Sequence, residues 1–524
     1  MRKKFIAFIF IFLVSLSVLT YFWSTALYIW IAASPFLLIA IVDLTQKKHA
    51  VRRNFPIIGH FRYILESVRP EIQQYFIETN KDGMPFSRET RSVIYQRAKE
   101  QLDTLAFGSQ IDMNEPGYEW INHSLAPKKI LKEEPKVLIG GATCSQPYLC
   151  SRFNIAGMSY GALSSNAVLA LNKGAQMGGF AHNTGEGSIS PYHLQGGDLV
   201  WQIGTGYFGC RTPEGEFCYE KFKEQSKKPE VKMIEIKLSQ GAKPGHGGIL
   251  PAKKITPEIA AIRGVPLGKD VISPPSHSAF SNPIQLMEWI TQLRDASGGK
   301  PVGIKLSLGK RHEFLSMCKA MLETGIHPDF ITIDGAEGGT GAAPVEFANY
   351  LGTPLNDALI FVHNVLVGVN LREKIRVIAS GKITSGFNIA VKLSIGADLC
   401  YSARGMMFAL GCIQALRCNA NVCPTGLATH DPNLTEGLFV PDKAQRVANY
   451  HKHTVESFLE VLAATGHERP ECLKPWYVWK RKGFGQVKNY ADLFHYLQPG
   501  ELLVEPVPQE YRGPWNSAHA NSFS

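Results

Sequence analysis

The feature that most limits how this chain can fold is a series of short β-rich runs that alternate with helical stretches from about Lys136 onward. This alternation is typical of parallel strands joined by helices, and it predicts an α/β fold, a (β/α)8 TIM-type barrel. We expect an eighth strand, less clear than the others, between the fifth and sixth of the seven clear runs. These runs are Phe153 to Ala156, Gly179 to Asn183, Met233 to Leu238, Val302 to Leu306, Phe330 to Asp334, Arg376 to Ser380 and Leu399 to Ser402.

Glycine-rich loops follow five of these runs: GMSYGAL, which carries Met158 and Ser159, then HNTGEGS, SQGAKPGHGG, DGAEGGTGAAP and ASGKITSG. One such loop is often only a turn. The active site of a barrel lies on the loops at the carboxyl ends of its strands, and glycine lets the backbone approach a ligand closely. Five glycine loops in these positions therefore predict a ligand site.

The segment from Ala379 to Lys382 is typical of the place where barrels bind phosphate at a helix amino terminus. Lys305, at the end of the fourth run, either stands beside a flavin ring or pairs with a carboxylate such as Asp334. The residues expected to hold the cofactor are Met158, Ser159, Lys305, Ser380, Gly381, Gly396, Ala397, Ser402 and Arg404.

Three of the ten cysteines, Cys412, Cys418 and Cys423, crowd into one stretch with C-x5-C-x4-C spacing and a proline after the last. Iron–sulfur clusters are held by cysteine thiolates, whereas zinc sites favour closer pairs and a fourth ligand. Buried structural cysteines are another explanation. Three thiolates favour a three-iron cluster, although Cys400 or Cys472 could complete a four-iron one.

Two apolar runs, Phe5 to Trp23 and Ala26 to Val42, open the chain, and each approaches the length that a bilayer-crossing helix needs. A signal peptide and a buried soluble hairpin are the alternatives. Positive charge lies at both outer ends of the pair and not in the short connection, which by the positive-inside rule places both ends in the cytoplasm. The sequence thus predicts a membrane-anchored protein, multi-pass with two helices, whose catalytic body is cytoplasmic.

We expect four parts: residues 1–48 as a transmembrane hairpin, 49–130 as a mostly helical lead-in, 131–465 as the barrel with the cysteine segment, and 466–524 as a C-terminal extension. The extension, with Trp476 and Trp479, either lies against the membrane or packs on the barrel. The net charge of +10 does not indicate nucleic-acid binding, because the basic residues form no patch interleaved with aromatic residues.

From Ile155 to Asp431 the chain resembles the FMN-binding synthase domain of glutamate synthase, through KPGHGG, GGTGA and the cysteine stretch. The resemblance implies two cofactors, FMN and a [3Fe-4S] cluster. It also implies the reduction of 2-iminoglutarate, formed from 2-oxoglutarate and ammonia, to glutamate by hydride transfer from FMN. Carried over by motif, Lys237, Gln240, Lys243 and Arg263 would surround the dicarboxylate.

Glu186, in the same carried-over set, would polarise or protonate the imine nitrogen, beside Lys305 at the flavin. A loop-capping role is the alternative for Glu186. The sequence departs from the large bacterial enzymes where their KPGEGGQLPG reads KPGHGGILPA, with His246 and Ile249. The substrate is therefore less firmly indicated than the cofactors.

The family's glutaminase domain, which begins with a catalytic cysteine, has no counterpart at this amino terminus, and no G-x-G-x-x-G follows a predicted strand. We therefore expect ammonia from solution or a partner, and electrons from ferredoxin, a reductase subunit or a membrane donor. Two other hypotheses remain: a membrane-bound electron-transfer or scaffold subunit, and an FMN barrel acting on another oxo acid or imine.

Overall fold

The computed structural model describes residues 2–483 and 485–524. The chain divides into two compact units, residues 1–89 and residues 90–524, which are described separately.

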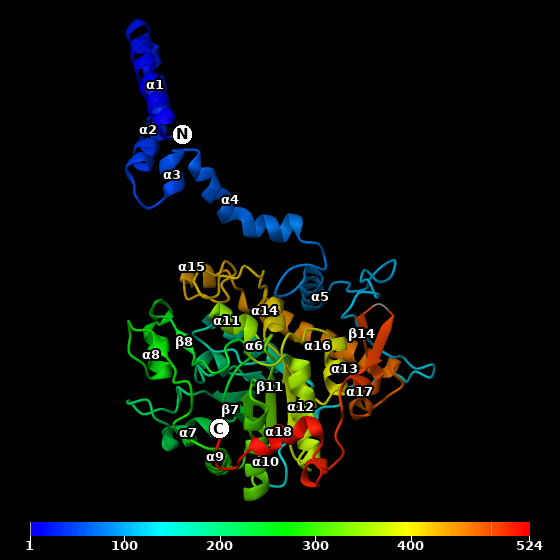
Figure 1. Ribbon diagram of the computed structural model, residues 1–524. Helices are drawn as coiled ribbons and strands as arrows, with labels where there is room; N and C mark the ends of the chain where they lie inside the picture. Colours follow the sequence, from blue (N-terminus) through cyan, green and yellow to red (C-terminus); the bar gives the residue numbers. More distant parts are fainter. Residues whose placement is uncertain (1, 484) are drawn as a thin grey trace. The chain divides into compact units, whose positions relative to one another are not determined.

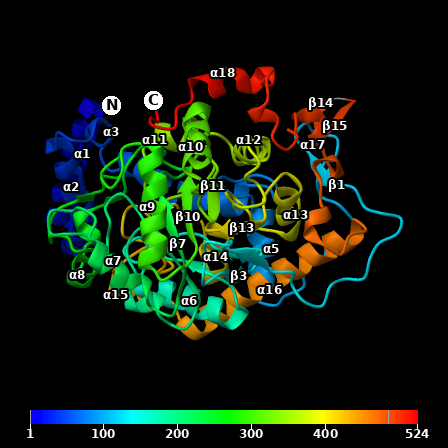
Figure 2. The same ribbon diagram turned by 90° about the horizontal axis from the view of Figure 1, so that it is seen from below.

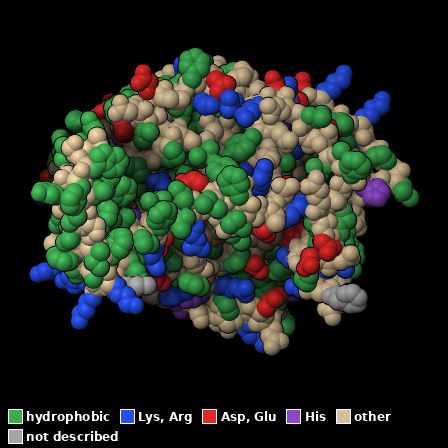
Figure 3. All heavy atoms as spheres, turned by 90° about the horizontal axis from the view of Figure 1, so that it is seen from above, with side chains coloured by type: hydrophobic (Ala, Val, Ile, Leu, Met, Phe, Trp, Pro, Cys, Tyr) green, Lys and Arg blue, Asp and Glu red, His purple; other side chains and the backbone are tan. Residues whose placement is uncertain are grey.

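The N-terminal unit contains the two expected apolar helices, α1 (Arg2–Phe22) and α2 (Leu27–Thr45), joined by a short 3-10 turn. They are antiparallel neighbours, since the Trp30 indole donates to the Thr20 hydroxyl (3.1 Å) near the turn and Arg2 donates to the Leu44 carbonyl (3.3 Å) at the open end. Both are long and apolar enough to cross a membrane, and most of their apolar side chains are exposed. Figure 3 shows hydrophobic side chains covering these helices at the left of the view. Next come α3 (Ala50–Asn54), α4 (Gly59–Ile72) and a π-helical turn, Gln73–Ile77.

The larger unit is a closed barrel of eight parallel strands (Figures 1 and 2). Each neighbouring pair is in parallel register, for example Lys305 beside Lys237 and Asp334 beside Ser380. The strands, in order around the barrel, are β4 (Phe153–Ile155), β5 (His182–Asn183), β6 (Leu199–Ile203), β7 (Val231–Lys237), β10 (Val302–Leu306), β11 (Phe330–Asp334), β12 (Arg376–Ser380) and β13 (Leu399–Ser402). The predicted TIM-type barrel is confirmed.

The eighth strand is not where the sequence predicted it. It is β6, which lies between the second and third predicted strands, whereas the chain between β11 and β12 forms the helices α11 (Val345–Tyr350) and α12 (Leu355–Gly368). All five residues of β6 are buried, so the strand lacks the polar alternation that marks a half-buried strand. The apolar run in α12 is 14 residues long, a helical length.

Helices surround the barrel, and several of them begin at a side-chain cap. Ser164, Asn282 and Ser385 each accept a hydrogen bond from the backbone N–H three residues ahead. The longest helix, α16 (Val440–Ala464), packs against α6, α13 and α14 and closes one side of the ring (Figure 2). The helices are α5 (Arg88–Ala98), α6 (Ser165–Gly178), α7 (Tyr219–Ser226), α8 (Pro257–Arg263), α9 (Pro283–Ala296), α10 (Arg311–Thr324), α13 (Gly386–Ser394), α14 (Arg404–Leu410), α15 (Pro432–Thr435), α16 (Val440–Ala464), α17 (Tyr490–Leu493) and α18 (Gln509–Ser517).

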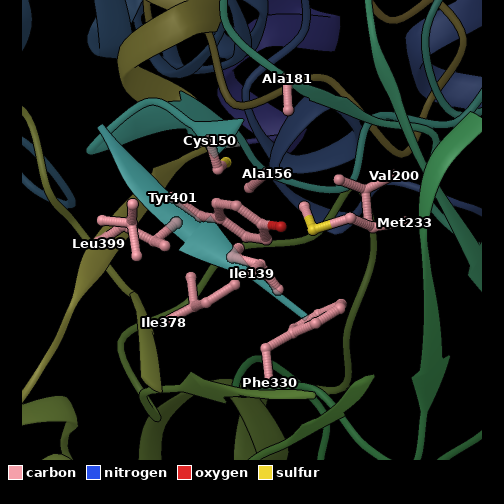
Figure 4. Packing of buried hydrophobic residues seen from close by; sticks show 11 residues of the cluster. Ile139, Cys150, Ala156, Ala181, Val200, Met233, Phe330, Ile378, Leu399 and Tyr401 are labelled. Carbon is pink, nitrogen blue, oxygen red and sulfur yellow. The ribbon is translucent and has the colours of Figure 1, made fainter. Parts of the chain in front are cut away.

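An antiparallel hairpin, β2 (Val137–Ile139) and β3 (Tyr148–Cys150), contributes to a buried apolar cluster at the amino-terminal end of the barrel. Its residues Ile139 and Cys150 belong to one cluster with Met233, Phe330 and Tyr401 (Figure 4). Phe330 is the first residue of β11, which places the cluster at the end where the strands begin. A packed amino-terminal end leaves the carboxyl-terminal end for a ligand.

The C-terminal residues pack on the larger unit, in agreement with one of the two predictions for them. Strand β14 (Val478–Gly483) pairs with β1 (Glu119–Ile121) and β15 (Gln486–Asn489), and the Trp120 and Trp479 rings stack with centroids 6.2 Å apart. Further along, the Tyr511 ring stacks on Phe361. A small hairpin, β8 (Ile249–Leu250) and β9 (Val271–Ile272), rises from the loop after β7.

Candidate active site

The carboxyl ends of the strands carry most of the predicted site residues. Lys237, Asp334, Ser380 and Ser402 are the last residues of their strands, Lys305 is the last but one of β10, and the loops after β4 and β5 contain Met158, Ser159 and Glu186. Parallel strands bring these ends to one rim of the barrel.

Glu186 lies in a cationic environment. Its Oε2 atom is 3.1 Å from Nζ of Lys237. Burial raises the pKa of Glu186, but Lys237, Lys243 and Arg263 together bring it below its ordinary value. The side chain is therefore an ionised carboxylate with three cations around it, an excess of positive charge that suits an anionic ligand.

Two glycines, each on a different loop, leave the space that the Glu186 carboxylate occupies. A Cβ atom on Gly204, after β6, would lie 2.5 Å from Oε2, and one on Gly248, before β8, would lie 2.4 Å from Oε1. Any larger residue at either position would displace the carboxylate. Gly248 also brings its neighbour Ile249, which is 39% exposed, to the edge of the site.

Arg263 reaches the loop after β4 from the end of α8. Its Nη2 atom donates to the Tyr160 carbonyl (2.9 Å), and its guanidinium lies 5.1 Å from the Phe208 ring centroid. Burial lowers the pKa of Arg263 to about 10 while Glu186 raises it, so the group stays charged at neutral pH. Burial also lowers the pKa of Lys243, whereas Glu186 raises it. Gln240 is partly exposed, and its carbonyl accepts from the Lys243 N–H (3.4 Å).

Lys305 forms the ion pair with Asp334 that its alternative interpretation predicted, at 3.4 Å. Asp334 also accepts hydrogen bonds from the Ser380 hydroxyl (2.9 Å) and the Gly241 N–H (3.0 Å). Burial lowers the pKa of Lys305, but Asp334, Glu235 and Glu186 raise it above its ordinary value. A protonated, buried Lys305 thus stands at the rim of the barrel.

Two further cations lie side by side after β12 and β13. Burial lowers the pKa of Lys382, and the neighbouring Arg404 lowers it further. Arg404 donates to the Glu337 carbonyl (2.6 Å), and Ser402 donates to the Ile383 carbonyl (2.7 Å). Gly381 has φ +151°, a conformation that favours glycine. Lys382 is exposed and Arg404 is half-buried, and two adjacent cations next to a glycine turn fit a phosphate, whose charge would relieve their repulsion.

Gly396 and Ala397 lie at the opposite end of the barrel, so the structure does not bring them together with the other predicted cofactor residues. They precede β13, and Asp398, the next residue, donates through its N–H to Val377, at the start of β12 (2.7 Å). Arg372 donates to the Gly396 carbonyl (3.0 Å). The cause is α13, which returns the chain to the amino-terminal end between the two motifs.

Met158 and Ser159 lie where the loops after β4 and β5 meet. The Met158 N–H donates to the Asn183 carbonyl (3.0 Å), and a Cβ atom on Gly185 would lie 3.0 Å from the Ser159 nitrogen. His193, which the sequence reasoning missed, donates through Nε2 to the Met158 carbonyl (3.0 Å).

The cysteine segment, residues 411–431, follows α14. Gln414, Leu416 and Asn421 all have positive φ, which is uncommon outside glycine. Lys254 holds the segment by donating to the carbonyls of Cys418 (2.8 Å) and Ala428 (3.3 Å). On another side, the Tyr95 hydroxyl of α5 donates to the Cys412 carbonyl (2.5 Å).

The three thiols influence one another but are not gathered around one point. Across residues 2–483 and 485–524, no group of three or more His, Cys, Asp or Glu side chains is close enough to hold a metal ion. Burial raises the pKa of Cys412 to about 12, and Cys418 and Cys423 add to this. Cys400 and Cys472 lie outside the segment, in β13 and in a 3-10 turn.

The surroundings of the thiols suit an iron–sulfur cluster. The Gln414 N–H donates to Sγ of Cys412 (3.4 Å), and Sγ of Cys423 lies 3.4 Å from the Thr425 hydroxyl oxygen. Burial raises the pKa of Cys423, but Thr425 and the backbone N–H groups of residues 425, 427 and 428 bring it below the ordinary value. Such N–H to sulfur contacts accompany cluster thiolates.

Contacts made by His430 join the cysteine segment to the loop after β4. The His430 Nε2 atom lies 2.8 Å from the Gly161 carbonyl, and the His430 ring meets the Tyr160 ring edge-on at 5.8 Å. Tyr160 is also the residue whose carbonyl receives Arg263. The expected cluster, cofactor and substrate groups are thus in one contiguous region.

Sequence reasoning also missed a buried polar group inside the barrel. The Glu235 carboxylate is 0% exposed and accepts hydrogen bonds from Asn183 (2.8 Å), Gln202 (2.6 Å) and Thr332 (2.6 Å). The signal was an acid between two isoleucines in the strand VKMIEIK. It links four strands below the predicted substrate residues.

A family model described as the conserved region in glutamate synthase matches residues 119–468 of this chain. The chain belongs to the glutamate synthase family. It is 40% identical to the glutamate synthase large subunit-like protein YerD of Bacillus subtilis, over 90% of this chain and 98% of that protein.

Two other members of the family are matched over part of their length. The archaeal glutamate synthase [NADPH] of Methanocaldococcus jannaschii is 34% identical over 68% of this chain and 66% of that protein. The ferredoxin-dependent glutamate synthase of Cyanidium caldarium is 33% identical over 61% of this chain and 21% of that protein. Among solved structures, a mandelate oxidase variant with (S)-mandelic acid is 12% identical over 82% of this chain and 97% of that chain, with a TM-score of 0.42.

Proposed function

We propose that this member of the glutamate synthase family is a membrane-anchored oxidoreductase that uses FMN and a [3Fe-4S] cluster to reduce 2-iminoglutarate, formed from 2-oxoglutarate and ammonia, to glutamate. The observation that carries the proposal is the set of three cations, Lys237, Lys243 and Arg263, around the single carboxylate of Glu186. Three cations and one anion leave two positive charges, which match the two carboxylates of the substrate.

The same arrangement gives Glu186 a way to handle a proton. In the free protein the three cations keep the carboxylate ionised. When a dicarboxylate takes their charge, burial of Glu186 again dominates and its pKa rises, so that Glu186 becomes able to hold a proton at the imine nitrogen. Substrate binding would thus allow Glu186 to act as a general acid. Glu186 and Lys305 are the proposed catalytic residues.

The chain's residues also fit the cofactors. Lys382, Arg404, Ser380 and Gly381 would hold the FMN phosphate, Ser402 would support that turn, and Lys305, Met158 and Ser159 would lie along the flavin. Cys412, Cys418 and Cys423 would hold the cluster. When bound, the cluster passes electrons to FMN, and FMN supplies the hydride.

Ammonia and electrons would come from outside the chain. We propose free ammonia, or ammonia from a partner, as the nitrogen source, and ferredoxin, a reductase subunit or a membrane donor as the electron source. The similarity to a ferredoxin-dependent enzyme supports the first donor, and the similarity to enzymes that use NADPH supports the second. The helices α1 and α2 would anchor the protein as a two-helix membrane hairpin with the barrel in the cytoplasm.

The proposal is tested on anaerobically purified full-length protein. Absorbance and low-temperature EPR, with FMN and iron quantified, should give one FMN and a three-iron signal, and chemical reductant with 2-oxoglutarate and ammonia should yield glutamate. Changing Lys305 and Gly381 together should abolish FMN binding. Protein without flavin would overturn the proposal, and flavin with no turnover would leave an electron-transfer or scaffold role.

A second candidate, another oxo acid or imine as substrate, is favoured by the position of Ile249. This exposed apolar side chain adjoins Gly248, where an added Cβ atom would lie 2.4 Å from Oε1 of Glu186. An apolar group there would accept a less polar side chain than that of 2-oxoglutarate. A panel of oxo acids assayed with the wild type and with Ile249→Gln separates the two: for a 2-oxoglutarate enzyme, no apolar oxo acid would be turned over faster.

A further inference from the structure

Helix α4 of the N-terminal unit presents an apolar stripe to solvent. Ile58, Phe61, Leu65, Val68 and Ile72 are between 39% and 68% exposed, and Ile64, at 55%, widens the stripe. At 100° per residue these side chains fall within about one third of the helix circumference. A stripe of this size without cover is unusual on a soluble surface.

The rest of the α4 surface is mainly polar, with Tyr63 and Pro70 as exceptions. Arg62 and Arg69 border the stripe on one side, and Arg62 pairs with Glu66 at 2.9 Å. His60, Ser67 and Glu71 complete the polar surface. Arginines at the border of an apolar face can extend their charged ends into lipid headgroups while their stems remain in the apolar layer.

The start of α4 is fixed to the end of α2. Asp43, only 2% exposed, accepts from the Ile57 N–H (2.9 Å), and its carboxylate is 2.9 Å from Nε2 of His60. Gly59 lies so close to α3 that an added Cβ atom would be 3.0 Å from Cα of Arg52. Figure 1 shows α4 leaving the helical hairpin at a wide angle. The amphipathic helix therefore begins at the level where α2 ends.

We propose that α4 is an in-plane membrane helix whose apolar stripe is buried at the boundary between headgroups and acyl chains. The proposal rests on the proposed membrane hairpin and deepens it from two spanning helices to an anchor of two spans and one interfacial helix. Six cations between the end of α2 and the end of α4 make the lipid partner anionic by charge complementarity: Lys47, Lys48, Arg52, Arg53, Arg62 and Arg69. Glu66 and Glu71 lie on the polar surface and do not cancel this excess.

The test uses a photo-crosslinking amino acid placed at single positions of the full-length protein, reconstituted in nanodiscs of phosphatidylcholine with a minority of phosphatidylglycerol. The probe replaces Phe61 on the stripe, Glu66 on the polar surface, or Phe8, an exposed residue of α1. These side chains are exposed, so the probes need not disturb packing. Mass spectrometry then identifies each adduct as lipid or peptide.

Lipid adducts at Phe8 and Phe61, with a several-fold lower yield at Glu66, would support the proposal. Lipid adducts at Phe8 combined with peptide adducts at Phe61 would overturn it, since α4 would then pack on the barrel or on a second copy. Equal lipid yields at Phe61 and Glu66 would also overturn it. Absence of lipid at both Phe8 and Phe61 would overturn the hairpin as well, and the cofactor measurements, made separately, would leave the proposed chemistry untouched.

A second measurement covers the case of an unreactive probe. Hydrogen exchange of residues 59–72 in nanodiscs should be about tenfold faster in Phe61→Glu, Leu65→Glu protein than in the wild type. The matched control, Glu66→Gln, should exchange as the wild type does. Equal exchange in all three proteins would contradict the proposal.

Discussion

Oε2 of Glu186 lies 3.1 Å from Nζ of Lys237, and Lys243 and Arg263 also act on the charge of this carboxylate. One carboxylate cannot neutralise three buried cations, so binding of an anion lowers the free energy of the site. This imbalance supports an anionic substrate, and it makes the function of Glu186 testable apart from its structural contacts.

Replacing Glu186 with glutamine should separate binding from turnover. Glu186→Gln leaves three cations with no carboxylate between them, so we expect 2-oxoglutarate to bind at least as tightly as in the wild type. Turnover should fall by about 10²–10⁴-fold if the residue serves as the acid. The measurements are kcat for glutamate formation and the Kd from flavin absorbance changes. Unchanged kcat would show that Glu186 only caps its loop.

Replacing Gly187 with alanine should disturb Arg263. A Cβ atom at Gly187 would lie 2.6 Å from Nη2 of Arg263 and 2.8 Å from Cβ of Ser159. The guanidinium must shift, so the KM for the dicarboxylate should rise by about tenfold, equivalent to roughly 1.4 kcal/mol. Gly309→Ala is the matched control, because nothing lies within 4 Å of its added Cβ atom. Equal KM values in the two variants would place Arg263 outside the substrate site.

The strand ends could be predicted from the sequence because charged and glycine residues interrupt apolar runs there. The predicted runs ending at Leu238, Asp334 and Ser380 indicated both the barrel and the rim that carries its site, and the observed strands end at Lys237, Asp334 and Ser380. Strand β6 was missed although all five of its residues are buried, as are those of β10 and β11, which were predicted. The position of Gly396 could not be predicted either, because a motif's distance along the chain does not show which end of the barrel it reaches.

Contacts between distant segments were also beyond the sequence. Lys254 reads as one of two adjacent surface lysines, and only the fold shows that its ammonium is buried 2.8 Å from the Cys418 carbonyl. Likewise, the Glu235 carboxylate accepts hydrogen bonds from donors on three other strands, which its own strand does not reveal. Periodicity describes one segment at a time and contains nothing about such pairs.

Lys254 should control the properties of the cysteine segment. In Lys254→Met the carbonyls of Cys418 and Ala428 lose a charge-assisted donor, a change that costs about 1–3 kcal/mol. We expect less iron per chain, and a lower reduction potential in the cluster that remains, since a nearby cation favours the reduced state. Redox titration followed by EPR measures the potential.

Lys253→Met provides the control for this experiment, because Lys253 is the exposed neighbour of Lys254 and has the same charge. It should leave the iron content and the potential as in the wild type. If the two variants behave alike, the effect of Lys254 would be one of net charge and not of its hydrogen bonds.

His193 should make the loop after β4 sensitive to acid. The buried ring accepts from the Ser190 N–H at Nδ1 (3.1 Å) and donates from Nε2 to the Met158 carbonyl (3.0 Å), which requires the neutral form. Burial lowers the pKa of His193 to about 4, from an ordinary value of 6.5. Between these values the unfolded chain binds a proton that the folded chain does not.

The contribution of His193 to folding is therefore complete above pH 6.5 and is lost as the pH falls through 4. A shift of this size corresponds to about 3 kcal/mol. Melting temperatures of the wild type and of His193→Gln, measured between pH 4 and 7, should converge toward the acid end as the wild type loses more stability than the variant. Because Met158 lies in the proposed flavin loop, release of flavin should follow the same pH dependence in the wild type. Parallel melting profiles for the two proteins would mean that the His193 ring binds its proton outside this pH range or that the loop tolerates the charge of the protonated ring.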